Sequence, residues 1–194
     1  MNFLAHIYLS GDHHEIKIGN FIADSVRGRK YLNYPENIQK GILLHRAIDT
    51  YTDSHPTVRM STKKLHKNYH HYSSVIVDIL YDHFLAKYWS VYHSTPLDIY
   101  VEDFYKELES YYPILPEKVK KMMPYMIADN WLLSYKTVDG IGRILYQMNK
   151  RTKYKSKMNF AVIELEQYYT EFETEFRSFF DELITFSAHK LKSL

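Results

Sequence analysis

The sequence predicts an all-α protein, a single-domain helical bundle that covers residues 1–194. Apolar residues recur at helical spacing along most of the chain, and no segment shows the strict alternation that is typical of a half-buried strand. The chain contains only 6 glycines and 6 prolines, which leaves room for long uninterrupted helices. No internal repeat or low-complexity linker divides the sequence, and its length suits one domain with a substantial core.

Glycine and proline set the expected helix boundaries at the start of the chain. A short helix is expected over residues 1–10, and a second helix over residues 13–27 closes near Gly28. Pro35 opens a third helix, because proline is favoured at the first helical position, and the periodic pattern continues to about Ser54.

The middle of the chain contains three further candidate helices. Pro56 separates the preceding helix from a polar helix over residues 57–70, and a strongly amphipathic helix follows over residues 73–91. A helix over residues 97–111 is expected to take Thr95 as its N-cap, because a T-x-x-D sequence typical of a capping box begins there.

The last part of the chain begins with three prolines that break up residues 112–124. One or two helices are expected over residues 125–149, and a break would fall at Gly140 and Gly142. Residues 158–188 are expected to form one long helix, because apolar side chains recur on one face at alternating intervals of four and three. These side chains are Leu165, Tyr169, Phe172, Phe176, Phe179 and Leu183.

The composition excludes several classes of protein. The chain has no cysteine, which removes disulfides, thiolate catalysis and cysteine-based zinc sites. The first residues lack the basic region and cleavage site of a signal peptide, and no apolar run is long enough to cross a bilayer. A net charge of +2 is too small to indicate nucleic-acid binding. We therefore expect a cytoplasmic protein with neither a membrane nor a nucleic acid as partner.

Basic residues nevertheless gather in two places. Considered alone, such runs are more often solvated helix ends and loops than binding surfaces, and a docking surface for an acidic partner is the alternative. The first cluster contains Lys118, Lys120 and Lys121. The second contains Arg143, Lys150, Arg151, Lys153, Lys155 and Lys157.

Two of the expected helices carry polar groups on faces that should turn inward. In residues 41–56, one face carries His45, Asp49, Thr52 and Asp53, flanked by apolar residues. In residues 73–89, the apolar stripe includes Asp78 and Asp82, with His83 on the neighbouring flank.

Several buried carboxylates need a partner, because an unpaired charge is costly to bury and like charges repel. Arg27 and Arg46 are candidate ion-pair partners, and protonation is a second resolution. A bound cation is the third, since an imidazole beside a carboxylate, as in His45 and Asp49, suits divalent Mn, Mg, Fe or Zn. Spacing alone leaves a metal site and a buried polar network equally favoured.

Two segments near the amino terminus add similar residues. His6 lies in an apolar segment, and Asn20 and Asp24 stand four apart in another. The ordinary interpretation of His6 is a core histidine, and that of Asn20 and Asp24 is helix capping and a salt bridge to Arg27 or Arg29. Four segments with the same property together favour a convergent site.

The common nucleotide-binding and serine-hydrolase motifs are absent from the chain. Four sequence blocks that resemble a known family coincide with these segments. MNFLAHIYLS at residues 1–10, GNFIADSVRG at 19–28, GILLHRAIDTYTDSHPTVR at 41–59 and DILYDHFLAKYW at 78–89 together resemble the acyl carrier protein phosphodiesterase family. The resemblance extends more weakly through NWLLSY at 130–135 and into the last helix, so it covers most of the chain.

The resemblance implies an activity and a cofactor. Members of this family remove the 4'-phosphopantetheine arm from holo-acyl carrier protein and release apo-carrier protein and 4'-phosphopantetheine. They use a divalent cation, typically Mn2+, with Mg2+ or Fe2+ as alternatives, and are regarded as all-helical, HD-domain-like relatives of metal phosphohydrolases. The substrate would then be an acidic carrier protein, which favours the docking interpretation of the basic clusters.

The resemblance also implies a set of site residues, in which Asp53 is included without a role. The expected metal ligands are His45, Asp49, Asp82 and Asp24, with His6 as an alternative to Asp24. The expected catalytic residues are His6, Asp24 and His83. The expected substrate-binding residues are Asn20, Arg27 and Arg46.

One departure from the wider HD pattern leaves the individual metal ligands open, and two alternative functions are also retained. HD enzymes use an adjacent His-Asp pair, whereas this chain has His45 with Asp49 and the reversed pair Asp82-His83. The alternatives are a hydrolase of another phosphoester, such as a nucleotide, and a non-catalytic helical module that binds an acidic protein.

Overall fold

The computed structural model describes residues 1–194, and its regular elements are all helices, so the all-α prediction is confirmed. The α-helices are α1 (Phe3–Tyr8), α2 (His14–Ile22), α3 (Glu36–Ser54), α4 (Pro56–Tyr69), α5 (Ser73–Lys87), α6 (Trp89–Tyr92), α7 (Leu97–Ser110), α8 (Glu117–Ala128), α9 (Trp131–Ser134), α10 (Val138–Arg151), α11 (Ala161–Gln167) and α12 (Tyr169–Lys192). Short 3-10 turns are η1 (Ala23–Ser25), η2 (Gly28–Asn33), η3 (His70–Tyr72), η4 (Tyr112–Ile114) and η5 (Met158–Phe160). No helix is both long and apolar enough to span a membrane.

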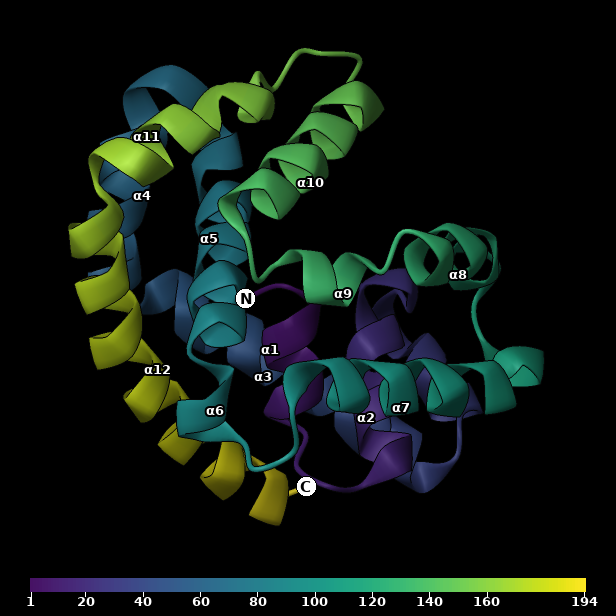
Figure 1. The fold of residues 1–194 in the computed structure, drawn as a ribbon. Helices are drawn as coiled ribbons and strands as arrows, with labels where there is room; N and C mark the ends of the chain where they lie inside the picture. The colour runs from purple at the N-terminus through teal and green to yellow at the C-terminus, as the bar shows by residue number, and fades with distance from the viewer.

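The first helix lies at the centre of the fold. α1 packs against both α2 and α5, and α12 curves along one side of the molecule in contact with α3, α4 and α5 (Figure 1). α7 and α8 lie on the side opposite α12, and the chain begins between α5, α9 and α10 (Figure 1). Residues near the amino terminus therefore meet side chains from the middle of the chain.

Two glycines allow α2 and α3 to cross at backbone contact. A β-carbon on Gly19 would lie 2.2 Å from the carbonyl oxygen of Ile38, and one on Gly41 would lie 2.2 Å from that of Ile16. No other residue fits at such distances. The crossing holds Asn20 of α2 beside α3.

The seam predicted for residues 158–188 is present, but the single long helix was wrong. Phe172, Phe176 and Phe179 are fully buried in the main core. The chain leaves helical geometry at Tyr168 and divides the segment into α11 and α12. The break lets α11 pack on α10 while α12 turns onto α3, α4 and α5.

Three other boundaries differ from the prediction. The helix expected over residues 13–27 ends at Ile22, where the 3-10 turn η1 follows. The helix expected over residues 73–91 ends at Lys87, and Tyr88 separates it from α6. The N-cap of α7 is Pro96 rather than Thr95. The carbonyl of Thr95 instead accepts a hydrogen bond from the indole of Trp89 at 2.8 Å, which holds this residue outside the helix.

The region before α10 contains more helix than predicted. α8 begins at Glu117 and includes Pro124, and α9 is a single turn. Gly140 does not break α10, which begins at Val138 with the hydroxyl of Thr137 accepting a capping hydrogen bond. A β-carbon on Gly140 would lie 1.8 Å from the carbonyl oxygen of Ser134, so this glycine permits close packing of α10 on α9.

Candidate metal centre

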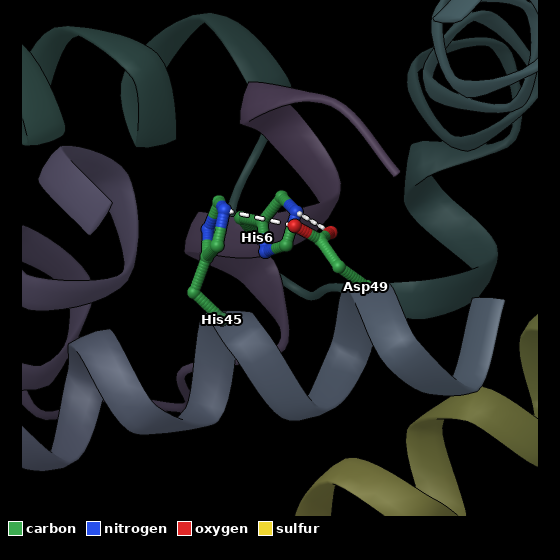
Figure 2. Close-up of side chains that lie close together, drawn as sticks. All are labelled: His6, His45 and Asp49. Carbon is green, nitrogen blue, oxygen red and sulfur yellow. Dashed lines mark ion pairs between the residues drawn. The ribbon is translucent and has the colours of Figure 1, made fainter. Parts of the chain in front are cut away.

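Three side chains from two helices converge beneath the start of the chain. His6 lies on α1, and His45 and Asp49 lie one turn apart on α3, with all three pointing toward one another (Figure 2). One ligand atom from each lies within 4.8 Å of the others. Ligand atoms about 2.1 Å from one cation are separated by roughly 3 to 4 Å, so this group fits a single ion after small adjustments.

The carboxylate of Asp49 contacts both imidazoles. Its oxygens lie 3.1 Å from Nε2 of His6 and 3.1 Å from Nε2 of His45. The imidazole rings stack with their centres 3.9 Å apart. Asp24 adds a second carboxylate, with Oδ1 at 3.3 Å from Nε2 of His45.

Asn20 fixes the orientation of His45. Its side-chain amide donates to the carbonyl of His6 at 2.9 Å and to the hydroxyl of Ser10 at 2.9 Å. The amide oxygen therefore remains to accept from Nδ1 of His45, which lies 3.1 Å away. With a proton on Nδ1, Nε2 is the atom that can bind a metal.

His6 is buried without adequate hydrogen bonding. Neither ring nitrogen makes a hydrogen bond of good geometry, although Nε2 lies 3.1 Å from Oδ1 of Asp49. Buried polar groups in native proteins are almost always satisfied. A cation beside Nε2 would satisfy this nitrogen.

The neighbouring groups shift the pKa values of the residues in this cluster. Burial lowers the pKa of His45, but hydrogen bonds to Asp24 and Asp49 outweigh burial and raise it to about 9. Burial, together with the charge of His45, lowers the pKa of His6 to about 4. Burial raises the pKa of Asp49, yet contacts with His45 and His6 hold it below its usual range. Without an ion, the cluster therefore combines a charged His45, a neutral His6 and an ionised Asp49.

The surrounding cavity is rich in carboxylates. It has a volume of about 240 Å3 and is lined by Asp24, Asp49, Asp53 and Asp78 in addition to His6 and His45. The Met1 ammonium pairs with Asp78 at 2.9 Å, and His45 forms ion pairs with Asp24 and Asp49. Carboxylates outnumber cationic groups, and together with two imidazoles they form a donor set that fits a divalent metal.

Asp82 does not lie with this cluster, although it was expected as a ligand. It is fully buried, and its carboxylate accepts backbone N–H groups from Leu4 at 2.7 Å and Asn2 at 3.2 Å. Burial raises the pKa of Asp82 to about 7, against the opposing influence of the amino terminus and these hydrogen bonds. Both oxygens accept hydrogen bonds from the start of α1, so Asp82 positions the helix that carries His6.

His83 also lies outside the cluster, and its expected catalytic role stays a prediction. Its Nδ1 lies 2.8 Å from the carbonyl of Tyr135 and its Nε2 lies 2.8 Å from the hydroxyl of Tyr169. Burial lowers the pKa of His83, and the side chain lines neither cavity around the metal centre. His83 connects α5 to the residue after α9 and to the start of α12.

The expected substrate-binding residues have different positions. Asn20 is fully buried behind His45, so it orients that imidazole and does not face substrate. Arg46 donates to the carbonyls of Val26 at 2.9 Å and Gly28 at 2.8 Å, which fixes the segment after Asp24 onto α3. Arg27 is exposed and follows Asp24 by three residues in the sequence, but it lines neither cavity at the site, and its role stays a prediction.

Sequence reasoning missed Ser10, whose hydroxyl accepts from Asn20 and donates to the carbonyl of His6 at 2.8 Å. The spacing of four residues from His6 was the available signal.

The fold and site define an all-helical protein with a candidate histidine–carboxylate metal centre. Residues 1–183 match the family described as acyl carrier protein phosphodiesterase. The chain is 30% identical to an acyl carrier protein phosphodiesterase of Pectobacterium atrosepticum, over 95% of this chain and 96% of that protein. It is 29% identical to proteins of the same description from Shigella boydii and Yersinia pestis, over 98% of this chain and 99% of each relative.

The chain therefore belongs to the acyl carrier protein phosphodiesterase family. No solved structure matches it, and the HD-domain-like description stays a prediction.

Proposed function

We propose that this protein hydrolyses the phosphodiester between 4'-phosphopantetheine and the serine of holo-acyl carrier protein. The products are apo-acyl carrier protein and 4'-phosphopantetheine. Family membership supports the reaction, and the convergence of His6, His45 and Asp49 in one cavity is the observation that supports a metal-dependent mechanism.

His6, His45 and Asp49 would hold the cation, with Asp24 as a fourth ligand at the exposed edge. Mn2+ is the proposed ion, and Mg2+ and Fe2+ are alternatives with compatible ligand preferences. A divalent ion bound here supplies Lewis acidity toward the phosphodiester and compensates the negative charge that develops during hydrolysis. Asp82 is omitted from this set because its oxygens cap α1.

The protein's own groups divide the remaining tasks. Asn20 orients the ring of His45, and Arg46 holds the segment that carries Asp24. His6 is better suited to ligation than to proton donation, because a group with a pKa of about 4 is unprotonated at neutral pH. Arg27 is exposed, follows Asp24 by three residues in the sequence, and is proposed to bind a non-bridging phosphate oxygen.

The second basic cluster is proposed as the docking surface for the carrier protein. Its members at the end of α10 and in the following turn are exposed, and Arg151 lines a cavity that also contains Asp24. Acidic residues of a carrier protein would be steered toward this surface, and association would slow as salt increases. The first cluster contributes Lys118, which lines the same cavity.

Mass spectrometry of holo-acyl carrier protein incubated with the enzyme and Mn2+ tests the proposal. We expect loss of the phosphopantetheine mass, its abolition by chelator and its restoration by added Mn2+. Asp103→Ala changes an exposed carboxylate on α7 and should act like wild type. An unchanged carrier-protein mass, with hydrolysis of nucleotides instead, would contradict the proposal.

A further inference from the structure

A second cavity of about 260 Å3 adjoins the metal centre. Its walls come from the first residues of the chain and from α5, α8, α9 and α10, where the amino terminus lies in Figure 1. Both cavities are lined by Met1, Asn2, Phe3, Asp24 and Asp78. The two cavities therefore share a wall, and a molecule bound at the metal centre would cross residues 1–3 to enter the second one, which we call the Trp131 cavity.

The Trp131 cavity combines apolar walls with one unused donor. Val75, Ile144 and Met148 contribute apolar surface, and Trp131 and Tyr135 contribute aromatic surface. The indole nitrogen of Trp131 is buried and has no hydrogen-bond partner. Buried N–H groups are almost always paired, so this N–H is a donor that an acceptor of a bound ligand would satisfy after a small side-chain movement.

Two cationic side chains complete the lining. Lys118 and Arg151 are exposed, and the guanidinium of Arg151 lies over the ring of Trp131, 5.3 Å from its centre. Arg151 also belongs to the basic cluster proposed to dock the carrier protein. The Trp131 cavity thus adjoins both the metal centre and the docking surface.

We infer that the Trp131 cavity holds the pantetheine arm while the phosphodiester lies at the metal centre, an inference that rests on the proposed function. The arm is a narrow chain in which amide groups alternate with short alkyl segments. Its alkyl segments match the apolar walls, and an amide carbonyl of the arm accepts the hydrogen bond from the indole of Trp131. Trp131 is therefore a binding residue that distinguishes the arm from a short phosphoester.

The indole protons offer a direct binding test, because the chain has only 2 tryptophans. Trp131→Phe assigns the two indole signals in a 15N-correlated spectrum of the labelled protein. Titration with 4'-phosphopantetheine in the presence of Mg2+ should shift the Trp131 signal. The signal of Trp89 should stay in place, since its indole is already bonded to Thr95 and lies outside this cavity. Binding without movement of the Trp131 signal would overturn the inference.

Kinetics of carrier-protein hydrolysis provide a second test. Ile144→Phe narrows the Trp131 cavity and should raise KM about tenfold, while Trp131→Phe removes one hydrogen bond and should raise KM about three- to tenfold. Ile163→Phe makes the same change at a residue that is 62% exposed and lines neither cavity, so its KM should equal that of wild type. Equal KM values for all these variants would overturn the inference.

The two experiments separate this inference from the proposed function. If no carrier protein is hydrolysed but 4'-phosphopantetheine shifts the Trp131 signal, the arm site stands and the reaction fails. If hydrolysis proceeds and neither the signal nor KM responds, the reaction stands and the arm lies elsewhere.

Discussion

Helices α3 and α5 both direct a carboxylate toward α1, yet the two carboxylates have different surroundings. Asp49 of α3 is 40% exposed and faces two imidazole nitrogens in an open cavity. Asp82 of α5 is fully buried and accepts hydrogen bonds from the backbone of α1. The first turn of a helix presents unpaired N–H groups, and a carboxylate that reaches them is satisfied without a metal.

The contrast shows that the role of an inward-facing carboxylate on a helix depends on the groups that it faces. Asp49 faces imidazole nitrogens, which can bind a cation through their lone pairs. Asp82 faces backbone N–H groups, which have no lone pair to offer a cation. The first carboxylate should therefore govern activity, and the second should govern stability.

The largest expected effect is on activity in Asp49→Ala. Removing this proposed ligand should lower the rate of carrier-protein hydrolysis by at least about a thousandfold, since the ion contributes several kcal/mol of transition-state stabilisation. Its free energy of unfolding should change by less than about 1 kcal/mol, because the carboxylate is partly solvated. Kinetics and urea denaturation check both values, with Asp103→Ala as the control. Wild-type activity in Asp49→Ala would remove the distinction between α3 and α5.

Asp82→Ala should show the reverse pattern. Loss of the carboxylate leaves the buried N–H of Leu4 unpaired, which should lower the free energy of unfolding by about 2 to 3 kcal/mol. Asp82→Asn keeps one acceptor and should lose less. Urea denaturation measures both variants, and unchanged stability in Asp82→Ala would show that capping of α1 is unimportant.

Asn20→Leu tests the support of the centre rather than its ligands. Without the acceptor for Nδ1, His45 can turn or change tautomer, and Mn2+ affinity should fall about 10- to 100-fold. Calorimetric titration gives the affinity. An affinity equal to that of wild type would mean that His45 is held by Asp24 and Asp49 alone.

The smallest expected effect is the release of a proton from His45 when an ion binds. The pKa of His45 is about 9 in the metal-free protein, so its imidazole carries an extra proton at pH 7 and must release it to bind an ion. About one proton should leave per ion at pH 7, and affinity should rise about tenfold per pH unit until pH approaches 9. Calorimetry in buffers of different ionisation enthalpy measures this release. A pH-independent affinity would contradict ligation by His45.

Local patterns predicted the all-α fold and much of the cluster, because helical spacing determines which side chains share a face. His45 and Asp49 are one turn apart and could be grouped from sequence alone. The position of Asp82 could not be predicted in this way, because it depends on the approach of α1 across 78 residues of sequence. The same holds for His83, whose partners Tyr135 and Tyr169 lie 52 and 86 residues away.

We propose that His6, His45 and Asp49 hold one divalent ion. Pulsed electron paramagnetic resonance of the Mn2+-loaded protein tests it most directly, since it detects nitrogen nuclei bound to the ion. We expect coupling to two imidazole nitrogens, reduced to one in His45→Gln and unchanged in His83→Gln. Mn2+ surrounded only by oxygen ligands, or nitrogen coupling lost in His83→Gln, would contradict it.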